Sequence, residues 1–498
     1  MRLEELTKAV PGHVTVLGYT RNEITSLCTD SRKVEKGALF FCIPGLRTDA
    51  HDFGPMVAAN GASALVVERR LDVDCAQVVV RNVREALSYM AAAFYGNPAK
   101  KLKMIGITGT KGKTTVSFLV KSILEAAGHK VGLIGTVCSM IGEKSIPANL
   151  TTPDPVEFQK MLRDMADQGA EYVVMEVSAH ALAMHRLDGV HYLVGGFTNF
   201  SQDHLDFFGT MDRYLDTKMR FLTPEFVDQV VYNADDLHIQ KRISELDLPK
   251  TTIGIRVDSA VHANDIEINE RGCSFRLTFY KRFTFPVELH LSGIFNVYNA
   301  MMAAALCDAA GIDRESLRQG LETLRNVPGR IELLETDTPY RVILDYAHSP
   351  DALENILTTV RQTSRPGAQV IALFGCGGDR DHEKRPIMGE IGGKLSDFVI
   401  LTSDNPRSED PYAILRDIEE GIKRTKTPYV VIENRREAIR RALTIAKPGD
   451  VVVLAGKGHE TYQEIQGVKH AFDEKIVVAE LLTEMHGAPK LPDGGENA

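Results

Sequence analysis

The stretch Gly106-Ile-Thr-Gly-Thr-Lys-Gly-Lys-Thr-Thr115 holds the residue types that bind a nucleoside triphosphate. In a glycine-rich turn between a strand and a helix, backbone N–H groups surround phosphate oxygens, and the helix N-terminus adds partial positive charge. Lys113 would reach the terminal phosphates and Thr114 would offer its hydroxyl to magnesium. The strict pattern G-x-x-x-x-G-K-[ST] is not met, because Ile107 stands five residues before Gly112. The glycines, the lysine and the threonines that the chemistry needs are all present.

This phosphate loop predicts a nucleotide but no particular reaction. The sequence has no N-K-x-D motif of the kind that reads guanine in GTPases. A one-domain kinase or ATPase would leave the long flanking segments unexplained. The residues expected to contact the nucleotide here are Gly109, Thr110, Lys111, Gly112, Lys113, Thr114 and Thr115.

Other polar residues stand where apolar runs end. Glu176 follows the apolar "YVVM", so a strand would place its carboxylate at the sheet edge beside the phosphate loop. Asn296 and Asn299 lie three apart and therefore on one helix face, and N-capping explains at most one of them. His204 in "SQDHLD" and Lys218 in "YLDTKMRF" are unremarkable by themselves.

The apolar run Phe398–Leu401 breaks into "SDNPRSEDP". Asn-Pro and Asp-Pro pairs are typical of turns, yet this turn also carries an arginine. A guanidinium recognises a carboxylate through two parallel hydrogen bonds, so Arg407 would suit an acidic ligand. For Ser408 to Pro411 only a turn is expected.

The apolar pattern also predicts the elements that position these residues. "KMIGITGTKGKTTVSFLVKSILEAAGHKVGLIG" has the period and punctuation of a βαβ unit. Beyond a boundary near residue 330, four apolar runs each end in a polar loop: "RVILDYAHSP", "VIALFGCGGDRD", "FVILTSDNPR" and "DVVVLAGKGHE". This pattern predicts an open parallel sheet with helices on both faces and ligands beyond the carboxyl ends of the strands.

The length of 498 residues exceeds what one hydrophobic core usually supports, so three α/β domains are expected, at 1–100, 101–330 and 331–498. A net charge of −9 argues against a nucleic-acid binder. The seven cysteines include no C-x-x-C pair, which indicates reduced thiols. No apolar run is long enough to span a bilayer. We therefore expect a cytoplasmic protein, and a monomer.

Several motifs in order resemble the Mur ligase family over nearly the whole chain: "TDSRKVEKGALFFCIPG", "TGTKGKTT", "EVSAHAL", "TNFSQDHLDFFG", "GIFNVYNAMMA", "NVPGR" and "DYAHSPDAL". The resemblance implies an N-terminal α/β domain for a UDP-linked substrate, a central P-loop ATPase-like parallel-sheet domain and a C-terminal Rossmann-like domain. It also implies an ATP-dependent amide ligase of peptidoglycan precursor synthesis. The expected substrates are UDP-N-acetylmuramoyl-L-alanyl-D-glutamate and meso-2,6-diaminopimelate.

The resemblance gives roles to residues that the pattern leaves open. It implies magnesium bound by Thr114, Glu176, His204 and a carbamylated Lys218, and ATP contacts from Asn296, Arg330 and Asp345. His348 would line the same catalytic site as Lys113, with its role open. The UDP-linked substrate would contact Ser31, Thr151, Thr152, Ser178 and Arg186, although Met184 stands where family members often carry glutamine.

The diaminopimelate site implied by the resemblance consists of Arg380, Asp404, Asn405, Pro406, Arg407, Gly456 and Glu460. Family members that add lysine usually lack the arginine at position 407, so Arg407 favours diaminopimelate. Three alternatives stay open: lysine as acceptor, a folylpolyglutamate synthetase, and a nucleotide-binding scaffold of cell-wall enzymes without catalysis. The N-terminal "TDSR" segment disfavours the second, and the intact set of Lys113, Glu176, His204 and Lys218 disfavours the third.

Overall fold

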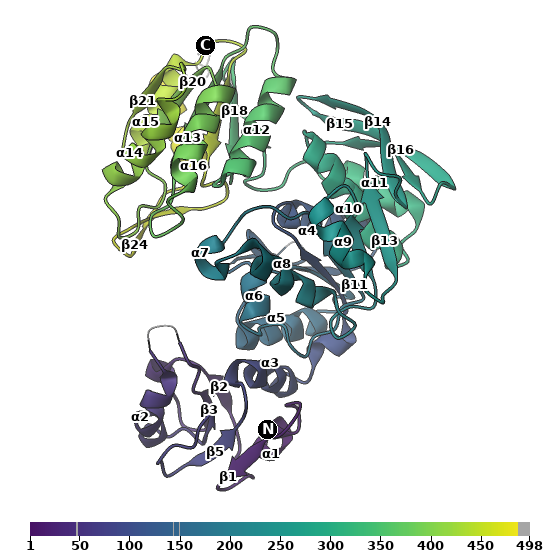
Figure 1. Cartoon of the computed structure of the whole chain (residues 1–498), viewed down its shortest axis with the longest axis vertical. Coiled ribbons are helices and arrows are strands. Elements are labelled where there is room, and N and C mark those ends of the chain that lie inside the picture. Colours follow the sequence, from purple (N-terminus) through teal and green to yellow (C-terminus); the bar gives the residue numbers. More distant parts are fainter. Residues whose placement is uncertain (46–47, 143, 149, 487–498) are drawn as a thin grey trace, which may run out of the picture. The chain divides into compact units, whose positions relative to one another are not determined.

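In the computed structural model, the described residues are 1–45, 48–142, 144–148 and 150–486, and they form two compact units (Figure 1). The first unit holds Met1–Phe200, Asp212–Ala260 and Met302–Gly320, and the second holds Ser201–Met211, Val261–Met301 and the chain from Leu321 onward. Both contain sheets rich in parallel strands with packed helices, which confirms the predicted α/β class. The boundaries expected at residues 100 and 330 stay a prediction.

The N-terminal sheet of the first unit is covered by helices on both faces. Its strands run in the order β1-β5-β4-β3-β2, with only β1 antiparallel to its neighbour. Leu39 and Phe41 pack toward one face and Phe40 toward the other, which is why this run is apolar without alternation. The elements are β1 (Thr15–Leu17), β2 (Ser26–Cys28), β3 (Ala38–Phe41), β4 (Ala64–Val67), β5 (Ala76–Val79), α1 (Leu3–Thr7), α2 (Gly54–Ala59) and α3 (Val83–Phe94).

The central part of the first unit carries the predicted βαβ unit. Its strands run in the order β13-β12-β11-β6-β10-β7-β8-β9, and those from β12 to β7 pair in parallel. The strands are β6 (Lys103–Thr108), β7 (Val131–Ile134), β8 (Cys138–Ile141), β9 (Lys144–Pro147), β10 (Tyr172–Glu176), β11 (Val194–Phe197), β12 (Val230–Asn233) and β13 (Lys250–Gly254). The helices are α4 (Lys113–Ala126), α5 (Pro155–Asp167), α6 (Ala179–Ala183), α8 (Met211–Met219) and α9 (Leu237–Ser244).

The second unit contains an antiparallel meander and a doubly wound sheet. The meander pairs β14 (Val261–Asn269), β15 (Gly272–Phe279) and β16 (Phe283–Leu289). The sheet has the order β17-β18-β22-β19-β20-β21, parallel except for β17. Its strands are β17 (Glu332–Leu333), β18 (Arg341–Asp345), β19 (Val370–Phe374), β20 (Phe398–Leu401), β21 (Tyr429–Val431) and β22 (Val451–Ala455).

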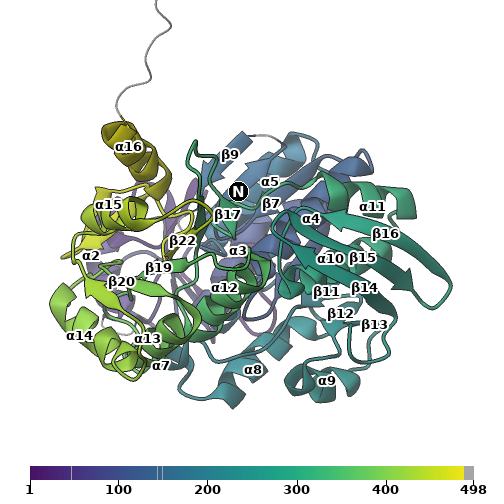
Figure 2. The same ribbon diagram turned by 90° about the horizontal axis from the view of Figure 1, so that it is seen from above.

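Helices cover both faces of this doubly wound sheet (Figure 2). One face packs on α12 (Pro350–Thr363), α13 (Lys384–Leu395) and α14 (Pro411–Ile422), and the other on α15 (Arg435–Ile445) and α16 (Glu474–His486). The four predicted strands with polar loops are β18, β19, β20 and β22, and they are confirmed. Because these strands are parallel neighbours, their loops leave the sheet at one edge.

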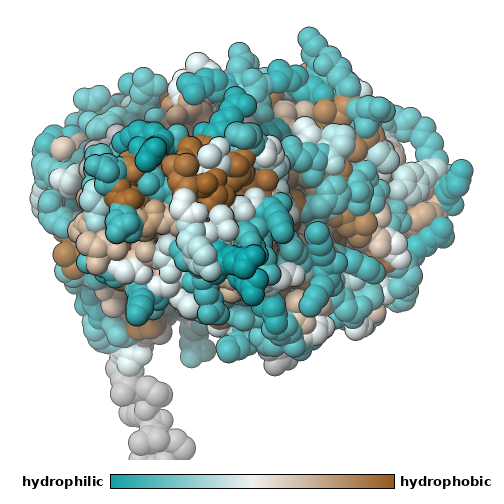
Figure 3. Space-filling view, turned by 90° about the horizontal axis from the view of Figure 1, so that it is seen from below, coloured by the Kyte–Doolittle hydropathy of each residue, from teal (hydrophilic) through white to brown (hydrophobic). Residues whose placement is uncertain are grey.

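The remaining elements are short or shared between the units. A hairpin of β23 (Tyr462–Ile465) and β24 (Val468–Ala471) follows β22, and α7 (Leu205–Phe208), α10 (Ile294–Ala309) and α11 (Arg314–Thr323) complete the helices. All seven cysteine thiols are unpaired. In the described ranges no helix is long and apolar enough to cross a bilayer. On the face shown in Figure 3, hydrophilic side chains surround separate apolar areas.

Candidate active site

The loop between β6 and α4 has the backbone of a phosphate-binding turn. Gly109 has φ 131° and Gly112 has φ 84°, a region of φ that glycine adopts without strain. A Cβ atom on Gly109 would lie 2.0 Å from Thr198 Oγ1. Because α4 begins at Lys113, its N-terminal N–H groups border this loop. The predicted strand, turn and helix are confirmed here.

Two lysine ammonium groups converge inside the loop. Lys113 Nζ donates to the carbonyl oxygens of Gly109 and Thr110, both at 2.9 Å. Lys218 Nζ, on α8, donates to the same Gly109 oxygen at 2.7 Å. Lys218 is 1% exposed. The fold therefore brings together two cations that the sequence separates by about a hundred residues, a separation of |i−j|=109 between Lys218 and Gly109.

Thr198 and Asn199 clamp the loop, and sequence reasoning gave them no role. Asn199 Oδ1 accepts from Lys111 N at 2.9 Å, and the Asn199 carbonyl accepts from Thr110 N at 2.8 Å. Thr198 Oγ1 donates to the Lys111 carbonyl at 2.6 Å. Both residues directly follow β11, the strand that pairs with β6. The rule that singled out Glu176, polar residues at the end of a buried strand, also applies to them.

Glu176 ends β10 beside this loop, as predicted, and is 1% exposed. Its two carboxylate oxygens accept from Thr136, one from the backbone N–H at 2.8 Å and the other from the hydroxyl at 2.9 Å. An ionised carboxylate has about four acceptor positions, so the group keeps capacity for a metal ion. Gly135 allows this approach, since a Cβ there would lie 2.5 Å from Glu176 Oε1.

These residues fit magnesium held together with a nucleotide. The described residues contain no group of three or more His, Cys, Asp or Glu side chains able to hold a metal ion. Magnesium is usually bound by one or two carboxylates together with substrate phosphates, and only rarely in a cage made of protein alone. Glu176 and the buried Thr114 are suitable oxygen donors of that kind.

Most of the hydroxyls expected to hold the UDP-linked substrate meet next to Glu176. Thr152 Oγ1 donates to the Glu176 carbonyl at 2.8 Å and lies 3.2 Å from Ser178 Oγ. Thr136 Oγ1 lies 3.1 Å from Thr151 Oγ1. Arg186 donates from Nη1 to the Thr152 carbonyl at 2.9 Å, and its Nε lies 3.0 Å from Asp154 Oδ1. The structure thus brings Thr151, Thr152, Ser178 and Arg186 into one cluster.

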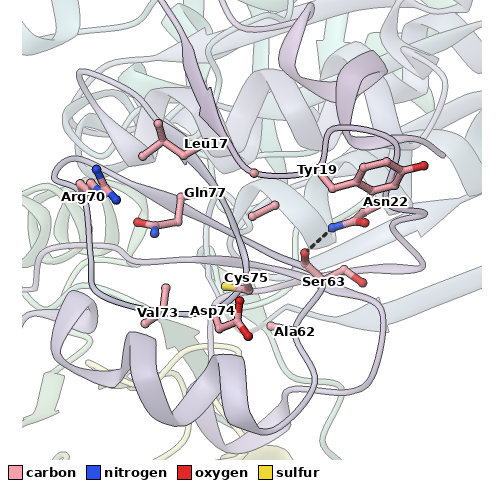
Figure 4. Close-up of a pocket in the computed structure, with 12 residues that line it drawn as sticks. Leu17, Tyr19, Asn22, Ala62, Ser63, Arg70, Val73, Asp74, Cys75 and Gln77 are labelled. Atoms are coloured by element: carbon pink, nitrogen blue, oxygen red, sulfur yellow. Dashed lines mark hydrogen bonds between the residues drawn. The ribbon is translucent and has the colours of Figure 1, made fainter.

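Ser31 is the exception. It opens the 3-10 helix Ser31–Lys33 after β2, and within the described ranges no hydrogen bond joins it to Thr152, Ser178 or Arg186. The N-terminal sheet also has a cavity of about 510 Å³, shown in Figure 4. Its lining includes none of the predicted residues, and two of its amides are already bonded: Gln77 to both backbone groups of Leu71, and Asn22 to the Ser63 carbonyl.

Three polar residues predicted to belong to the site, His204, Asn296 and Asn299, lie in the second unit. His204 has φ 55° and precedes α7, where its backbone N–H donates to Asp203 Oδ1 at 3.0 Å. Asn296 and Asn299 lie on one face of α10, and Asn299 Nδ2 donates to Asn296 Oδ1 at 2.9 Å. The predicted helix face is confirmed.

Arg330 and Asp345 meet at the edge of the doubly wound sheet. Asp345 accepts from Ile331 N at 2.7 Å and from Ala347 N at 2.8 Å. Burial raises the pKa of Asp345 above its ordinary value, and the nearby Arg330 guanidinium opposes that rise. The Arg330 guanidinium also lies 5.0 Å from the centre of the Tyr346 ring.

Three aromatic side chains pack together beside Arg330. The Tyr346 ring lies 4.6 Å from the ring of His348 and 4.9 Å from the ring of His459. Gly329 and Gly458 let the three segments touch, since a Cβ on Gly329 would lie 2.4 Å from His459 N. His459 was not among the residues singled out from the sequence, although it stands in the "AGKGHE" loop.

His459 predicts a pH dependence of stability. Burial lowers its pKa to about 4, and the cations Arg330 and Lys475 act in the same direction. In the unfolded chain a histidine titrates at about 6.5, so between these values the unfolded state binds more protons. The free energy of unfolding should therefore fall by about 2–3 kcal/mol as the pH drops from about 6.5 toward 4 on account of this group.

Urea unfolding of the wild type and of His459→Gln at pH 7 and pH 4.5 measures this contribution. The variant should lose less stability between the two pH values than the wild type. His470→Gln, which changes an exposed histidine of β24, is the matched control and should behave like the wild type. An unchanged pH dependence in His459→Gln would contradict the prediction.

The loops after β20 and β22 form one hydrogen-bonded network. Lys457 is 0% exposed, and its ammonium donates to Asn405 Oδ1 and Glu460 Oε2, both at 3.1 Å. Asn405 Nδ2 donates to the same Glu460 oxygen at 2.8 Å, and Asp404 Oδ1 lies 3.6 Å from Lys457 Nζ. Gly456 has φ 113°, and a Cβ there would lie 3.0 Å from Asp404 Oδ2. Lys457, absent from the predicted set, thus joins three predicted residues.

Arg407 lies between this network and the loop after β19. Its Nη1 donates to the Gly378 carbonyl at 2.9 Å, and its Nε lies 3.3 Å from Glu464 Oε2. A Cβ on Gly378 would lie 2.0 Å from the Pro406 carbonyl oxygen. The glycines of "GCGGDR" therefore permit close contact with the Asp404–Arg407 loop. Arg380 follows them and is exposed.

Ser408 to Pro411 do more than turn the chain, which corrects the expectation from sequence. Ser408 Oγ donates to Asp379 Oδ1 at 2.6 Å. Glu409 accepts from Asp379 N and from the buried Arg385, whose Nη2 lies 2.9 Å from both carboxylate oxygens. Asp410 caps α14, and Pro411 is its first residue. The first two residues hold the loop after β19 and the last two start a helix.

A buried ion pair anchors the same two loops from behind. Arg435 and Glu474 have side chains 0% exposed, and Arg435 Nε donates to Glu474 Oε1 at 2.8 Å. The other two nitrogens of Arg435 donate to the carbonyls of Ser403, at 3.2 Å, and Ala455, at 2.8 Å. These carbonyls stand where the chain leaves β20 and β22.

Comparison with known protein families gives three matches between residues 23 and 458. Residues 23–95 match the model described as Mur ligase family, catalytic domain; residues 107–307 match the Mur ligase middle domain; and residues 329–458 match the Mur ligase, glutamate ligase domain. The three matches follow the order of the three expected domains.

Relatives with curated names match over nearly their full length. A UDP-N-acetylmuramoyl-L-alanyl-D-glutamate–2,6-diaminopimelate ligase of Clostridium botulinum is 43% identical over 93% of this chain and 96% of that protein. A ligase of the same name from Bacillus velezensis is 44% identical over 93% of this chain and 95% of its own length. A solved structure of a ligase with this name superimposes with a TM-score of 0.70 at 33% identity, covering 97% of this chain and 99% of the other.

Proposed function

The chain belongs to the Mur ligase family, and on that basis we propose that it joins meso-2,6-diaminopimelate to UDP-N-acetylmuramoyl-L-alanyl-D-glutamate at the expense of ATP. The chain is an enzyme, a ligase of peptidoglycan precursor synthesis. Two observations support diaminopimelate as the acceptor. Relatives that are 41–44% identical over nearly their full length are named as diaminopimelate ligases, and this chain carries Arg407 in the loop after β20. Lysine as acceptor, and a scaffold without catalysis, are disfavoured on the same grounds.

The reaction has two steps. The side-chain carboxylate of D-glutamate attacks the γ-phosphorus of ATP, so that ADP leaves and an acyl phosphate forms. A neutral amine of diaminopimelate then attacks the acyl carbon, phosphate leaves with the C–O electron pair, and the amine gives up a proton to become an amide. Water must be excluded in between, because it would hydrolyse the acyl phosphate.

The first unit supplies groups suited to phosphoryl transfer. The glycine loop and α4 would bind the phosphates, and Lys113 would move from its carbonyl partners to the terminal phosphate. Thr114, Glu176 and a carbamylated Lys218 would hold magnesium, which would neutralise charge on the transferring group. His204, which belongs to the second unit, is proposed as a further ligand. The shared Gly109 carbonyl supports carbamylation, because carbon dioxide would convert one of two adjacent cations into an anion.

The second unit supplies groups suited to binding ATP and the acceptor. Asn296, Arg330 and Asp345 would contact the base, phosphates and ribose of ATP. His348 would lie nearby, because its ring packs on Tyr346, which in turn packs on Arg330. Arg380, Arg407 and the Asp404–Glu460 network would bind diaminopimelate, with carboxylates for its ammonium groups and guanidinium for its distal carboxylate. Ser31, Thr151, Thr152, Ser178 and Arg186 belong to the first unit and would bind the UDP-linked substrate.

Phosphate release in the presence of ATP tests the whole proposal. We expect release to need both the UDP-muramoyl dipeptide and an acceptor, and to be fastest with meso-diaminopimelate in a panel that includes its LL and DD isomers, L-lysine and L-ornithine. Mass spectrometry should show an amide product formed with loss of one water. Equal rates with lysine would contradict the acceptor, and phosphate release without an amide product would contradict the ligase reaction.

We further propose domains at 1–100, 101–330 and 331–498, and a monomer acting in the cytoplasm, where nucleotide-linked precursors are made. Sedimentation of the purified protein would test the monomer. Separate expression of residues 331–498 would test the last boundary, since a domain should fold alone.

A further inference from the structure

The β23–β24 hairpin is bonded to the Asp404–Arg407 loop instead of to a sheet. Gln463 Nε2 donates to the Asp404 carbonyl at 2.8 Å, and Glu464 N donates to Asn405 Oδ1 at 2.9 Å. Arg407 N donates to the Glu464 carbonyl at 3.0 Å, and Gln466 N donates to the Arg407 carbonyl at 2.7 Å. Residues 463–466 thus fix both the backbone and the side chains of this loop.

The hairpin holds Arg407 in a backbone conformation that arginine rarely adopts. Arg407 has φ 52°, in the left-handed region. A residue other than glycine persists there only when its surroundings compensate for the strain. The two backbone hydrogen bonds to Glu464 and Gln466 provide that compensation. The direction in which the Arg407 side chain leaves the loop is therefore set by the hairpin.

Glu464 also fixes the guanidinium itself. Its carboxylate lies 3.3 Å from Arg407 Nε, while the Gly378 carbonyl accepts from Nη1. Within the described ranges no group accepts from Nη2, which leaves the Nη1–Nη2 edge for a carboxylate bound through two hydrogen bonds. The side chains of Arg407 and Glu464 are 21% and 25% exposed, so a small ligand can reach them.

We propose that Glu464 is a positioning residue for acceptor selection: it orients Arg407 so that the free edge of the guanidinium reads the distal carboxylate of diaminopimelate. This inference rests on the proposed function. Glu464 would not touch the reacting atoms, so its removal should weaken recognition of the acceptor and leave chemistry with a bound acceptor nearly unchanged.

Steady-state kinetics of the full chain tests the role of Glu464. Glu464→Ala should raise KM for meso-diaminopimelate about fivefold with kcat within about twofold, as expected for loss of a partly exposed charge partner. Glu464→Gln keeps an acceptor for Nε, so the rise should be about twofold. KM for ATP and for the UDP-linked substrate should not change. The matched control is Glu480→Gln, which removes a carboxylate paired with Arg436 at 2.6 Å on α16.

Two further results separate this role from a structural one. The preference for diaminopimelate over L-lysine should fall in Glu464→Ala. L-Lysine has no distal carboxylate, so its binding does not depend on the orientation of Arg407. In the background of Arg407→Ala, adding Glu464→Ala should change KM no further, since the orienting carboxylate then has nothing to orient.

Three outcomes would overturn the inference: an unchanged KM for diaminopimelate, an equal rise in KM for lysine, or an additive effect in the double variant. If the wild type shows no turnover with diaminopimelate, it is the proposed function that fails. Circular dichroism melting of each variant against Glu480→Gln identifies one that fails to fold, and Glu464→Gln, which keeps size and shape, then carries the test.

Discussion

Replacing Lys218 with alanine is expected to lower kcat by about 10³-fold. The residue is 1% exposed and its ammonium shares the Gly109 carbonyl with Lys113. As a carbamate it would replace repulsion between two cations by attraction, and would add an anionic oxygen ligand beside the phosphates. Alanine would remove that ligand and leave a space next to the phosphate loop.

Rescue by small carboxylic acids makes this prediction specific. Formate or acetate should restore part of the phosphate release of Lys218→Ala, because a carboxylate resembles the lost carbamate. Lys121→Ala is the matched control: it removes a lysine of α4 that forms a surface pair with Glu125, and its activity should equal that of the wild type. Full activity of Lys218→Ala, or inactivity that no acid relieves, would contradict the carbamate.

Replacing Arg407 with alanine is expected to lower kcat/KM for diaminopimelate by about 30- to 1000-fold, equivalent to about 2–4 kcal/mol. The variant would leave the distal carboxylate of the acceptor without its charged partner. Arg407→Lys should recover only a minor part, because an ammonium cannot offer two parallel donors.

The kinetics of Arg407→Ala should be measured with diaminopimelate and with L-lysine. The rate with lysine, however slow, should change far less than the rate with diaminopimelate. Arg416→Ala is a suitable control, since this arginine of α14 is exposed and pairs with Asp410 at 3.5 Å. Equal losses with both acceptors would mean that Arg407 only supports its loop.

The sequence predicted the features that depend on short stretches of chain. The βαβ unit around the phosphate loop, the helix face shared by Asn296 and Asn299, and the four strands that end in polar loops are all present. Each follows from local periodicity or from one strand ending. The doubly wound sheet then places those loops at one edge, as the rule for parallel strands requires.

What the sequence did not predict depends on contacts between distant residues. Thr198 and Asn199 clamp a loop about ninety residues earlier, with |i−j|=88 for the bond between Asn199 and Lys111. Lys457 and Glu464 act on Asn405, more than fifty residues before them. Nothing in the local pattern around these residues indicates which partner they meet, since an isolated lysine or glutamate is usually solvated. The clamping role of Ser408 and Glu409 was missed for the same reason.

The buried Arg435–Glu474 pair has a consequence for attempts to change the acceptor by transplanting loops. One guanidinium fixes the carbonyl of Ser403 and that of Ala455. The two segments that begin at these carbonyls are therefore a single mechanical part, although more than fifty residues separate them. A graft of residues 404–407 alone from a ligase with a different acceptor preference would replace only one of these two segments. Residues 456–466 would have to be grafted together with them.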